Sequence, residues 1–224
     1  MPALMSVLMV VTLMSAPASA VVIGTARAAV GSIQLFEGAQ AFTTNSILTE
    51  DSTGAKVWDA GRLLSTLLAD MDLTGKRVLE LGSGTGVGGL TAAASGASVT
   101  LTDGAEAMLP LLEENIKANG LRDRAHCVRL EWGSVHDAAE LVAHGPWDMI
   151  IGSDLFYAPE SHSDLLCTLE ALCTPGHTEV LLAYPTRFTE GMFFDQAAEL
   201  FDQPEWPEEV EPGLYAARMV MRDE

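Results

Sequence analysis

A short apolar strand that runs into alternating glycines is the feature that most constrains the fold of this chain. Residues 77–81 read Arg-Val-Leu-Glu-Leu, and Gly82, Gly84 and Gly86 follow at every second position before an apolar, helix-like stretch. Glycine has no Cβ, so such a turn can adopt positive φ values and let a ligand approach its backbone. Ligands of open α/β sheets bind at the carboxyl ends of strands like this one. The stretch therefore predicts an α/β fold with a nucleotide-like ligand at the turn.

A second carboxylate ends the next predicted strand. Residues 98–102 are followed by Asp103, roughly 20 residues beyond the glycine turn, where α/β nucleotide folds place an acidic residue against ribose hydroxyls. Asp103 is therefore predicted to accept hydrogen bonds from a ribose. The same residue is also suited to cap a helix that begins near Ala105, and the two roles are compatible.

Three kinds of nucleotide-binding loop compete for the glycine turn. A phosphate-binding P-loop needs Lys and then Ser or Thr, and this turn has neither. A dinucleotide fingerprint can be traced from Gly84 through Gly86 to Gly89, and that interpretation stays open. The third pattern places Glu80 inside the strand, and its carboxylate suits a cationic cofactor better than a pyrophosphate.

The stretch Glu-Leu-Gly-Ser-Gly-Thr-Gly resembles motif I of the class I methyltransferases, which bind S-adenosylmethionine. Further matches follow in order: Leu-Glu-Trp at 130–132, and an apolar strand within 147–157 that runs into Asp-x-x-Tyr. Upstream, residues 54–61 precede a helix. Over about residues 45–190 the chain resembles the METTL21-type protein methyltransferases, also called methyltransferase family 16, most of whose known members modify lysines.

This resemblance implies a Rossmann-like seven-strand sheet with helices on both faces. Hydrophobic periodicity agrees, because strand-like and helix-like segments alternate from residue 77 onward, which is typical of a parallel sheet. Strands are predicted at 77–81, 98–102, 125–130, 147–153, 179–184 and 214–221, and helices at 87–95, 105–119, 135–143, 160–172 and 190–201. Residues 204–212 hold three prolines and four glutamates, so we expect an edge strand or an irregular loop there.

The resemblance also implies which residues hold the cofactor: Trp58, Glu80, Gly82, Ser83, Gly84, Gly86, Asp103, Trp132 and Ser153. Glu80 is expected to reach the methionyl amine or to order the glycine turn. Trp132 is expected to pack on the adenine, with ordinary core packing as an equal alternative. Trp58 is either a cofactor contact or a buried anchor, and Ser153 is expected to use its backbone.

Asp154 and Tyr157 are the predicted catalytic residues. A lysine amine has a pKa near 10.4, and a lone carboxylate would stabilise its charged form, which is not nucleophilic. Asp154 is therefore expected to orient the amine, while Tyr157 walls the lysine channel. The alternative for Asp154 is to cap a helix that starts near Pro159.

Charge narrows the choice of partner. The chain has 12 basic and 31 acidic residues, a net charge of −19, which argues against nucleic acid because phosphate contacts need Lys and Arg. We expect a protein substrate that presents a lysine in a basic or neutral segment, with a solubility adaptation as the rival explanation of the charge. A small-molecule methyltransferase on the same fold remains an alternative function, as does, more remotely, a dinucleotide-dependent oxidoreductase.

The cysteines and histidines predict no metal site and no disulfide framework, because the three cysteines and five histidines have no ligand-like spacing. We expect buried thiols, a cytoplasmic monomer and no stable membrane span. Residues 1–20 are apolar and end in Ala-Ser-Ala, so organelle or secretory targeting is the alternative. Residues 1–30 are interpreted as an extension and 31–224 as the methyltransferase domain.

Overall fold

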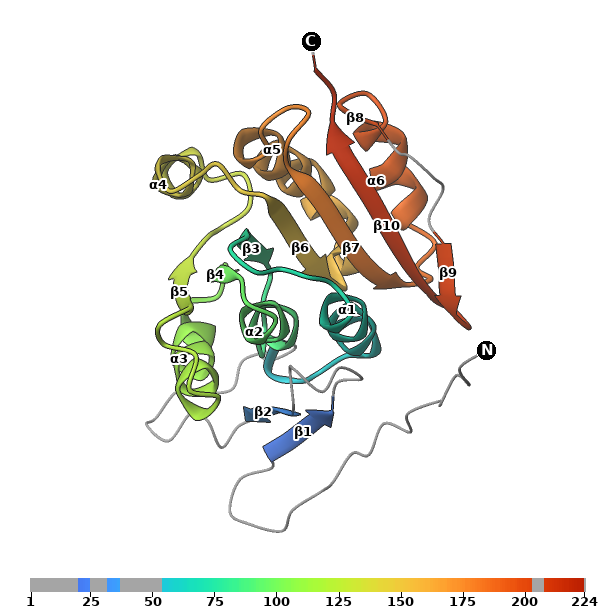
Figure 1. Ribbon diagram of the computed structural model, residues 1–224. Coiled ribbons are helices and arrows are strands. Elements are labelled where there is room, and N and C mark those ends of the chain that lie inside the picture. Colours follow the sequence, from blue (N-terminus) through green and yellow to red (C-terminus); the bar gives the residue numbers. More distant parts are fainter. Residues whose placement is uncertain (1–19, 25–31, 37–53, 203–207, 224) are drawn as a thin grey trace, which may run out of the picture.

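A mixed, eight-stranded sheet forms the centre of the computed structural model, which describes residues 20–24, 32–36, 54–202 and 208–223 (Figure 1). Five parallel strands run in the order β5-β4-β3-β6-β7. They are β3 (Arg77–Leu81), β4 (Ser98–Asp103), β5 (Ala125–Arg129), β6 (Met149–Ser153) and β7 (Glu179–Pro185). The order reverses between β3 and β6, and ligands bind outside the carboxyl ends of strands at such a switch point.

The remaining strands of this sheet are antiparallel. β10 (Leu214–Met221) pairs with β7, and the short strands β8 (Phe201–Asp202) and β9 (Glu208–Glu211) both pair with β10. The two short strands β8 and β9 thus lie beside β10, where a seven-strand methyltransferase sheet has its sixth strand. The edge strand predicted within 204–212 is confirmed in β9, while residues 204–207 lie outside the described residues. The predicted parallel arrangement holds for the five strands β3 to β7, and β10 adds an antiparallel strand at the C-terminal end.

Helices cover both faces of the sheet, as predicted (Figure 1). On one face lie α1 (Asp59–Ala69), α2 (Val87–Ala94) and α3 (Leu109–Ala118); on the other lie α4 (Val135–Ala143), α5 (His162–Leu172) and α6 (Glu190–Ala197). Short 3-10 helices lie in the connections from strands to helices: η3 (Glu106–Met108) between β4 and α3, and η4 (Leu155–Tyr157) and η5 (Pro159–Ser161) between β6 and α5.

Two apolar cores fill the spaces between helices and sheet. Because strand side chains alternate, Val78 packs with α1, α2 and α3, whereas Leu79 and Leu81 pack with α5 and α6. Glu80 has the same parity as Val78 and so points towards α2, where its carboxylate lies beside Gly88 and Gly89. The strand therefore buries a carboxylate within one of the two cores.

A two-stranded hairpin adds to the face that carries α1, α2 and α3. It consists of β1 (Ala20–Gly24) and β2 (Ser32–Phe36), and Ile33 and Leu35 are buried in the adjacent core. The sequence did not predict these strands, and β1 falls within the segment interpreted as an extension. Within the described ranges, no helix is both long and apolar enough to cross a membrane.

Candidate active site

A cavity of about 760 Å³ opens at the carboxyl ends of β3, β4, β5 and β6. The glycine turn after β3, the start of α1, the ends of β4 and β5, and η4 all contribute to its wall. Both predicted catalytic residues and every predicted cofactor residue except Glu80 and Gly86 line it. The topology thus brings together residues that are spread over 100 positions of the sequence, from Trp58 to Tyr157.

The glycine turn uses the conformational freedom that the sequence indicated. Gly82, Gly84 and Gly86 have φ values of 57°, 53° and 82°, in the left-handed region that favours glycine. A Cβ on Gly84 would lie 2.7 Å from the backbone oxygen of Gly54, and one on Gly86 would meet Leu101 and Leu112. Gly84 therefore lets the backbone at Gly54 approach the turn, while Gly86 allows close packing away from the cavity.

Hydrogen bonds hold the turn in one conformation. The Thr102 hydroxyl donates to the backbone oxygen of Glu80 at 2.7 Å, and the backbone N–H of Thr102 donates to the Ser83 hydroxyl at 3.0 Å. From the far side, the buried Asn115 amide donates to the backbone oxygen of Thr85 at 2.9 Å. These contacts preorganise the turn before any ligand arrives.

Asp103 faces the cavity at the end of β4. Its carboxylate accepts hydrogen bonds from the backbone N–H groups of Gly84 and Ala105, both at 3.0 Å. Burial raises the pKa of Asp103, and these two N–H groups oppose that shift. The capping contact with Ala105 is therefore present, and each oxygen keeps a lone pair for a ligand hydroxyl.

Glu80 is 2% exposed and lies outside the cavity lining, against the start of α2. Burial raises its pKa from 4.5 to about 7, while the Ser83 hydroxyl and the Gly89 and Gly88 N–H groups lower it. Its Oε2 atom has no hydrogen-bond partner among the described residues. Of the two roles expected for Glu80, ordering the turn fits this position better.

The two predicted tryptophans both line the cavity. The Trp132 ring lies against Gly82, where a Cβ would be 3.3 Å from its Cζ2, and also packs on the core beside α5. Trp58 is 44% exposed at the start of α1, with the Lys56 ammonium 4.9 Å from its ring centroid. Trp132 thus packs on the core and also lines the cavity. Trp58 is too exposed to be the buried anchor that was its alternative role.

Asp154 is joined to a residue that sequence reasoning missed. Arg187, two residues after β7, donates from Nε and Nη2 to the two carboxylate oxygens of Asp154 at 2.8 and 2.9 Å. No side-chain cap links Asp154 to the following helix. Tyr157 stands at the rim with 63% of its surface exposed. Arg187 could not be picked out because its partner is 33 positions away.

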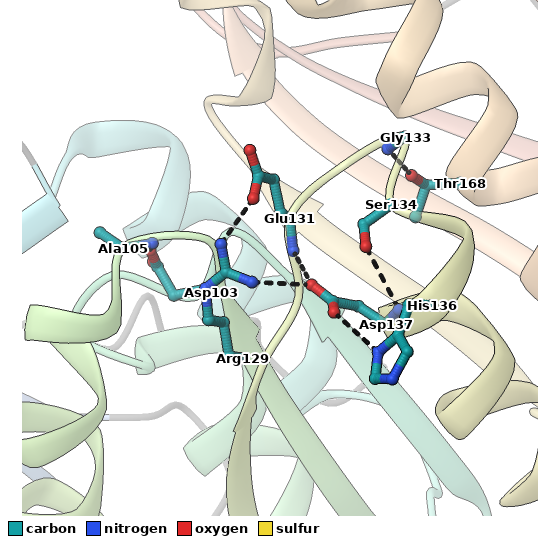
Figure 2. A network of polar contacts seen from close by, with 9 residues as sticks. All are labelled: Asp103, Ala105, Arg129, Glu131, Gly133, Ser134, His136, Asp137 and Thr168. Carbon is teal, nitrogen blue, oxygen red and sulfur yellow. Dashed lines mark hydrogen bonds and ion pairs between the residues drawn. The ribbon is translucent and has the colours of Figure 1, made fainter.

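A second polar network borders the cavity at the end of β5 (Figure 2). Arg129 donates to Glu131 at 2.5 Å and to Asp137 at 3.0 Å. The backbone N–H of Glu131 also donates to Asp137 at 3.0 Å, and this is the main reason that the pKa of Asp137 is lowered. The network fixes residues 129–131 beside Trp132, and no pattern in the sequence marked it.

The donor and acceptor set fits an adenosyl sulfonium cofactor. Asp103 can accept from two ribose hydroxyls, the glycine turn exposes backbone at Gly84, and Trp132 offers an aromatic wall. The cavity volume lies within the range of small-molecule sites. Across the described residues, no group of three or more metal-binding side chains occurs.

Comparisons with known proteins agree with this geometry. Residues 43–200 match the protein family described as "Lysine methyltransferase". The chain is 42% identical over 139 residues to Protein N-lysine methyltransferase METTL21A of Danio rerio, covering 60% of this chain and 62% of that protein. It is 34% identical over 159 residues to EEF1A lysine methyltransferase 3 of Mus musculus, covering 70% and 66%. The chain thus spans less than two thirds of the length of either relative.

Solved structures share the fold. One is a protein crystallised with SAH, which this chain matches with a TM-score of 0.64 at 18% identity, over 93% of this chain and 57% of that one. An identity this low supports the fold and nothing more specific.

Proposed function

Because this chain belongs to the lysine methyltransferase family that residues 43–200 match, we propose that it transfers a methyl group from S-adenosylmethionine to a protein lysine. One observation carries the proposal. A single cavity joins the glycine turn and Asp103, which suit an adenosyl group, to Asp154 and Tyr157, which suit an amine. The two relatives reported above, METTL21A and EEF1A lysine methyltransferase 3, are lysine methyltransferases by name.

Cofactor binding is assigned to one end of the cavity. Asp103 would accept hydrogen bonds from the ribose, Gly82 and Gly84 would let the ligand lie against backbone, and Trp132 would pack on the adenine. Ser153 and Trp58 border the same space and are proposed as further contacts. Bound there, the cofactor supplies an electrophilic methyl group for in-line displacement, and the protein supplies aim and electrostatics.

The acceptor end is assigned to η4 and the residue before it. Asp154 would orient the lysine amine, and the exposed Tyr157 would form one wall of the channel through which the lysine enters. Presenting the neutral amine at pH 7 costs about 4.6 kcal/mol, because the pKa of free lysine is near 10.4. The residues at this end must therefore help the amine to lose its proton.

The partner is proposed from charge. With a net charge of −19, the protein should attract a lysine in a basic or neutral segment of another protein. Of the three free cysteines Cys173 is buried, but Cys127 is half-buried and Cys167 is exposed, so the expectation of buried thiols is wrong for these two. Free thiols are consistent with a reducing compartment such as the cytoplasm. We also propose that the protein acts as a monomer.

The experiment is a transfer assay without a chosen substrate. The purified chain is incubated with methyl-labelled cofactor and a cell lysate, and labelled proteins are identified with their modified residue by mass spectrometry. Methyl-lysine in a protein band supports the proposal; label only in small molecules favours a small-molecule methyltransferase. Titration with S-adenosylhomocysteine and with NADH separates both from a dinucleotide-dependent oxidoreductase.

Asp154→Ala serves as the control variant. It should bind S-adenosylhomocysteine like the unaltered protein, because Asp103 and the glycine turn are untouched, but it should label no protein. Labelling that survives this change would remove Asp154 from the mechanism while leaving the transfer activity itself in place.

A further inference from the structure

Asp154 and Arg187 form a two-pronged ion pair in the wall of the cavity. Arg187 Nε donates to Asp154 Oδ1 at 2.8 Å and Nη2 donates to Oδ2 at 2.9 Å, and Nη2 also lies 2.7 Å from Oδ1. The Asp154 side chain is 11% exposed and that of Arg187 33%. Planar guanidinium groups match carboxylates in this geometry, which fixes orientation as well as charge.

The backbone around this pair is held in place on both sides. Asp154 has φ 56°, and it is the one non-glycine residue with positive φ in the described part of the chain. Its backbone N–H donates to Ala183 in β7 at 2.9 Å. The backbone N–H of Arg187 donates to Glu190 at 3.0 Å, and Thr189 reaches the backbone oxygen of Phe156. A strained residue so thoroughly anchored is typical of a functional position.

The pair resolves a conflict in the chemistry at the acceptor end. An unpaired, partly buried carboxylate would attract lysine as the ammonium ion and so keep its lone pair protonated. Arg187 cancels that charge but leaves carboxylate lone pairs free to accept one N–H bond from the amine. A guanidinium close to the amine also disfavours the ammonium by like-charge repulsion.

Resting on the proposed function, we propose that Arg187 is a positioning residue that aims Asp154 and cancels its charge, so that the acceptor lysine is received as the neutral amine. Arg187 touches the carboxylate and acts on the lysine through it. Burial raises the pKa of Asp154, and Arg187 opposes that shift by hydrogen bonding and by its charge.

Other titratable groups border this site from each neighbouring element, and they are Lys56, Asp103, Arg129, Glu131, Tyr157, Asp164 and Glu190. Arg129 is paired with Glu131, and Lys56 lies over the Trp58 ring. Among the charged groups of the described chain, Arg187 is the one that acts on the pKa of Asp154. Removal of Arg187 should therefore change the pKa of Asp154 more than removal of any other charged group in the described chain.

The test compares the pH dependence of methyl transfer in three variants, with the lysine-bearing substrate from the transfer assay. Arg187→Met leaves Asp154 charged and unpaired, so the acid limb of the kcat/KM profile should move up by about one pH unit or more. Arg187→Lys keeps the charge but loses the two-pronged geometry, so kcat should fall about tenfold with the limb in place. The double variant Asp154→Asn with Arg187→Met restores neutrality and keeps a side-chain oxygen as acceptor. In its residual activity, the limb should return towards its original position.

Two further measurements separate positioning from mere structural support. In the full chain without cofactor, NMR titration should show the Asp154 carboxyl pKa higher in Arg187→Met than in the unaltered protein. Affinity for S-adenosylhomocysteine should stay unchanged in all variants. Arg222→Met, which breaks the exposed pair with Asp202, is the matched control and should alter neither profile nor titration.

The inference is overturned if the acid limb is unaltered in Arg187→Met. It is also overturned if the double variant keeps the limb shifted as in Arg187→Met. In either case the proposed function stands. Should Arg187→Met fail to fold, Arg187→Lys decides, because a kcat equal to that of the unaltered protein would overturn the positioning role of Arg187. A protein that binds the cofactor but methylates no lysine overturns the proposed function, and the inference with it.

Discussion

The Asp103 carboxylate accepts hydrogen bonds from two backbone N–H groups and still faces the cavity. Asp103→Ala should therefore weaken S-adenosylhomocysteine binding at least about a hundredfold, because two hydrogen bonds to a charged acceptor are worth roughly 1.5–3 kcal/mol each. Isothermal titration calorimetry measures this directly. Unfolding stability should also fall, by about 1–3 kcal/mol, since Gly84 and Ala105 lose their acceptor.

The exposed Asp123→Ala is the control for that change, and it should leave both affinity and stability as they were. If Asp103→Ala binds S-adenosylhomocysteine as tightly as the control, the ribose assignment is wrong and the carboxylate only shapes the turn.

Glu80 predicts a pH dependence of stability. Its pKa is raised from 4.5 to about 7 by burial, so folding favours the protonated form. The resulting destabilisation is absent below pH 4.5, grows as pH rises towards 7, and is complete above it. Glu80→Gln should therefore stabilise the cofactor-free protein at pH 8 by roughly 3 kcal/mol at most, and hardly at pH 4.5.

Urea unfolding of both proteins at the two pH values checks this prediction, with the exposed Glu140→Gln as the matched control. Equal stability changes at both pH values would contradict a raised pKa at Glu80. A simultaneous loss of cofactor affinity in Glu80→Gln would show that the glutamate supports binding through the turn.

At the scale of elements, the turn between β3 and α2 depends on the absence of side chains. Gly84 and Gly75 both have positive φ, but a Cβ on Gly84 meets the backbone oxygen of Gly54 at 2.7 Å, while one on Gly75 meets nothing within 4 Å. Gly75→Ala should therefore cost about 1–2 kcal/mol of stability from backbone strain alone. Gly84→Ala should cost about 2 kcal/mol more, because a backbone atom must move.

Thermal unfolding and calorimetry of the two variants measure this difference. Gly84→Ala should also lose affinity for S-adenosylhomocysteine, whereas Gly75→Ala should bind it normally. Similar behaviour of the two variants would show that the contact between the turn and Gly54 gives way easily and does not shape the site.

For the molecule as a whole, the excess of 19 negative charges should steer a basic substrate. Raising the salt concentration from about 50 mM to about 300 mM should increase KM for a basic protein substrate severalfold and leave kcat unchanged, because ions screen long-range attraction. Steady-state kinetics with the identified substrate provide the measurement. A KM that does not respond to salt would mean that the acidic surface plays no part in substrate capture.

The affinity for S-adenosylhomocysteine is the internal control in that experiment. In the proposed cofactor cavity the arginines are already paired, Arg129 with Glu131 and Arg187 with Asp154, so salt should change cofactor binding little.

What the sequence determined by itself was local. The alternation of strand and helix from residue 77, the glycine turn, and the carboxylates at strand ends follow from backbone sterics and hydrophobic period, which act over a few neighbouring residues. Those patterns predicted the parallel part of the sheet, the glycine turn at Gly82, Ser83 and Gly84, and Asp103. The resemblance to the methyltransferase family implied five further residues that line the cavity: Trp58, Trp132, Ser153, Asp154 and Tyr157.

The tertiary structure alone decided which distant groups meet. It turned Glu80 into the core beside α2, made β10 antiparallel to β7, and brought Arg187 to Asp154 across 33 positions. Such pairings depend on strand order and crossovers, which bring residues together irrespective of sequence spacing. Local patterns and the family resemblance could therefore locate the site and name part of its wall, but Arg187, the ion-pair partner of Asp154, required the folded chain.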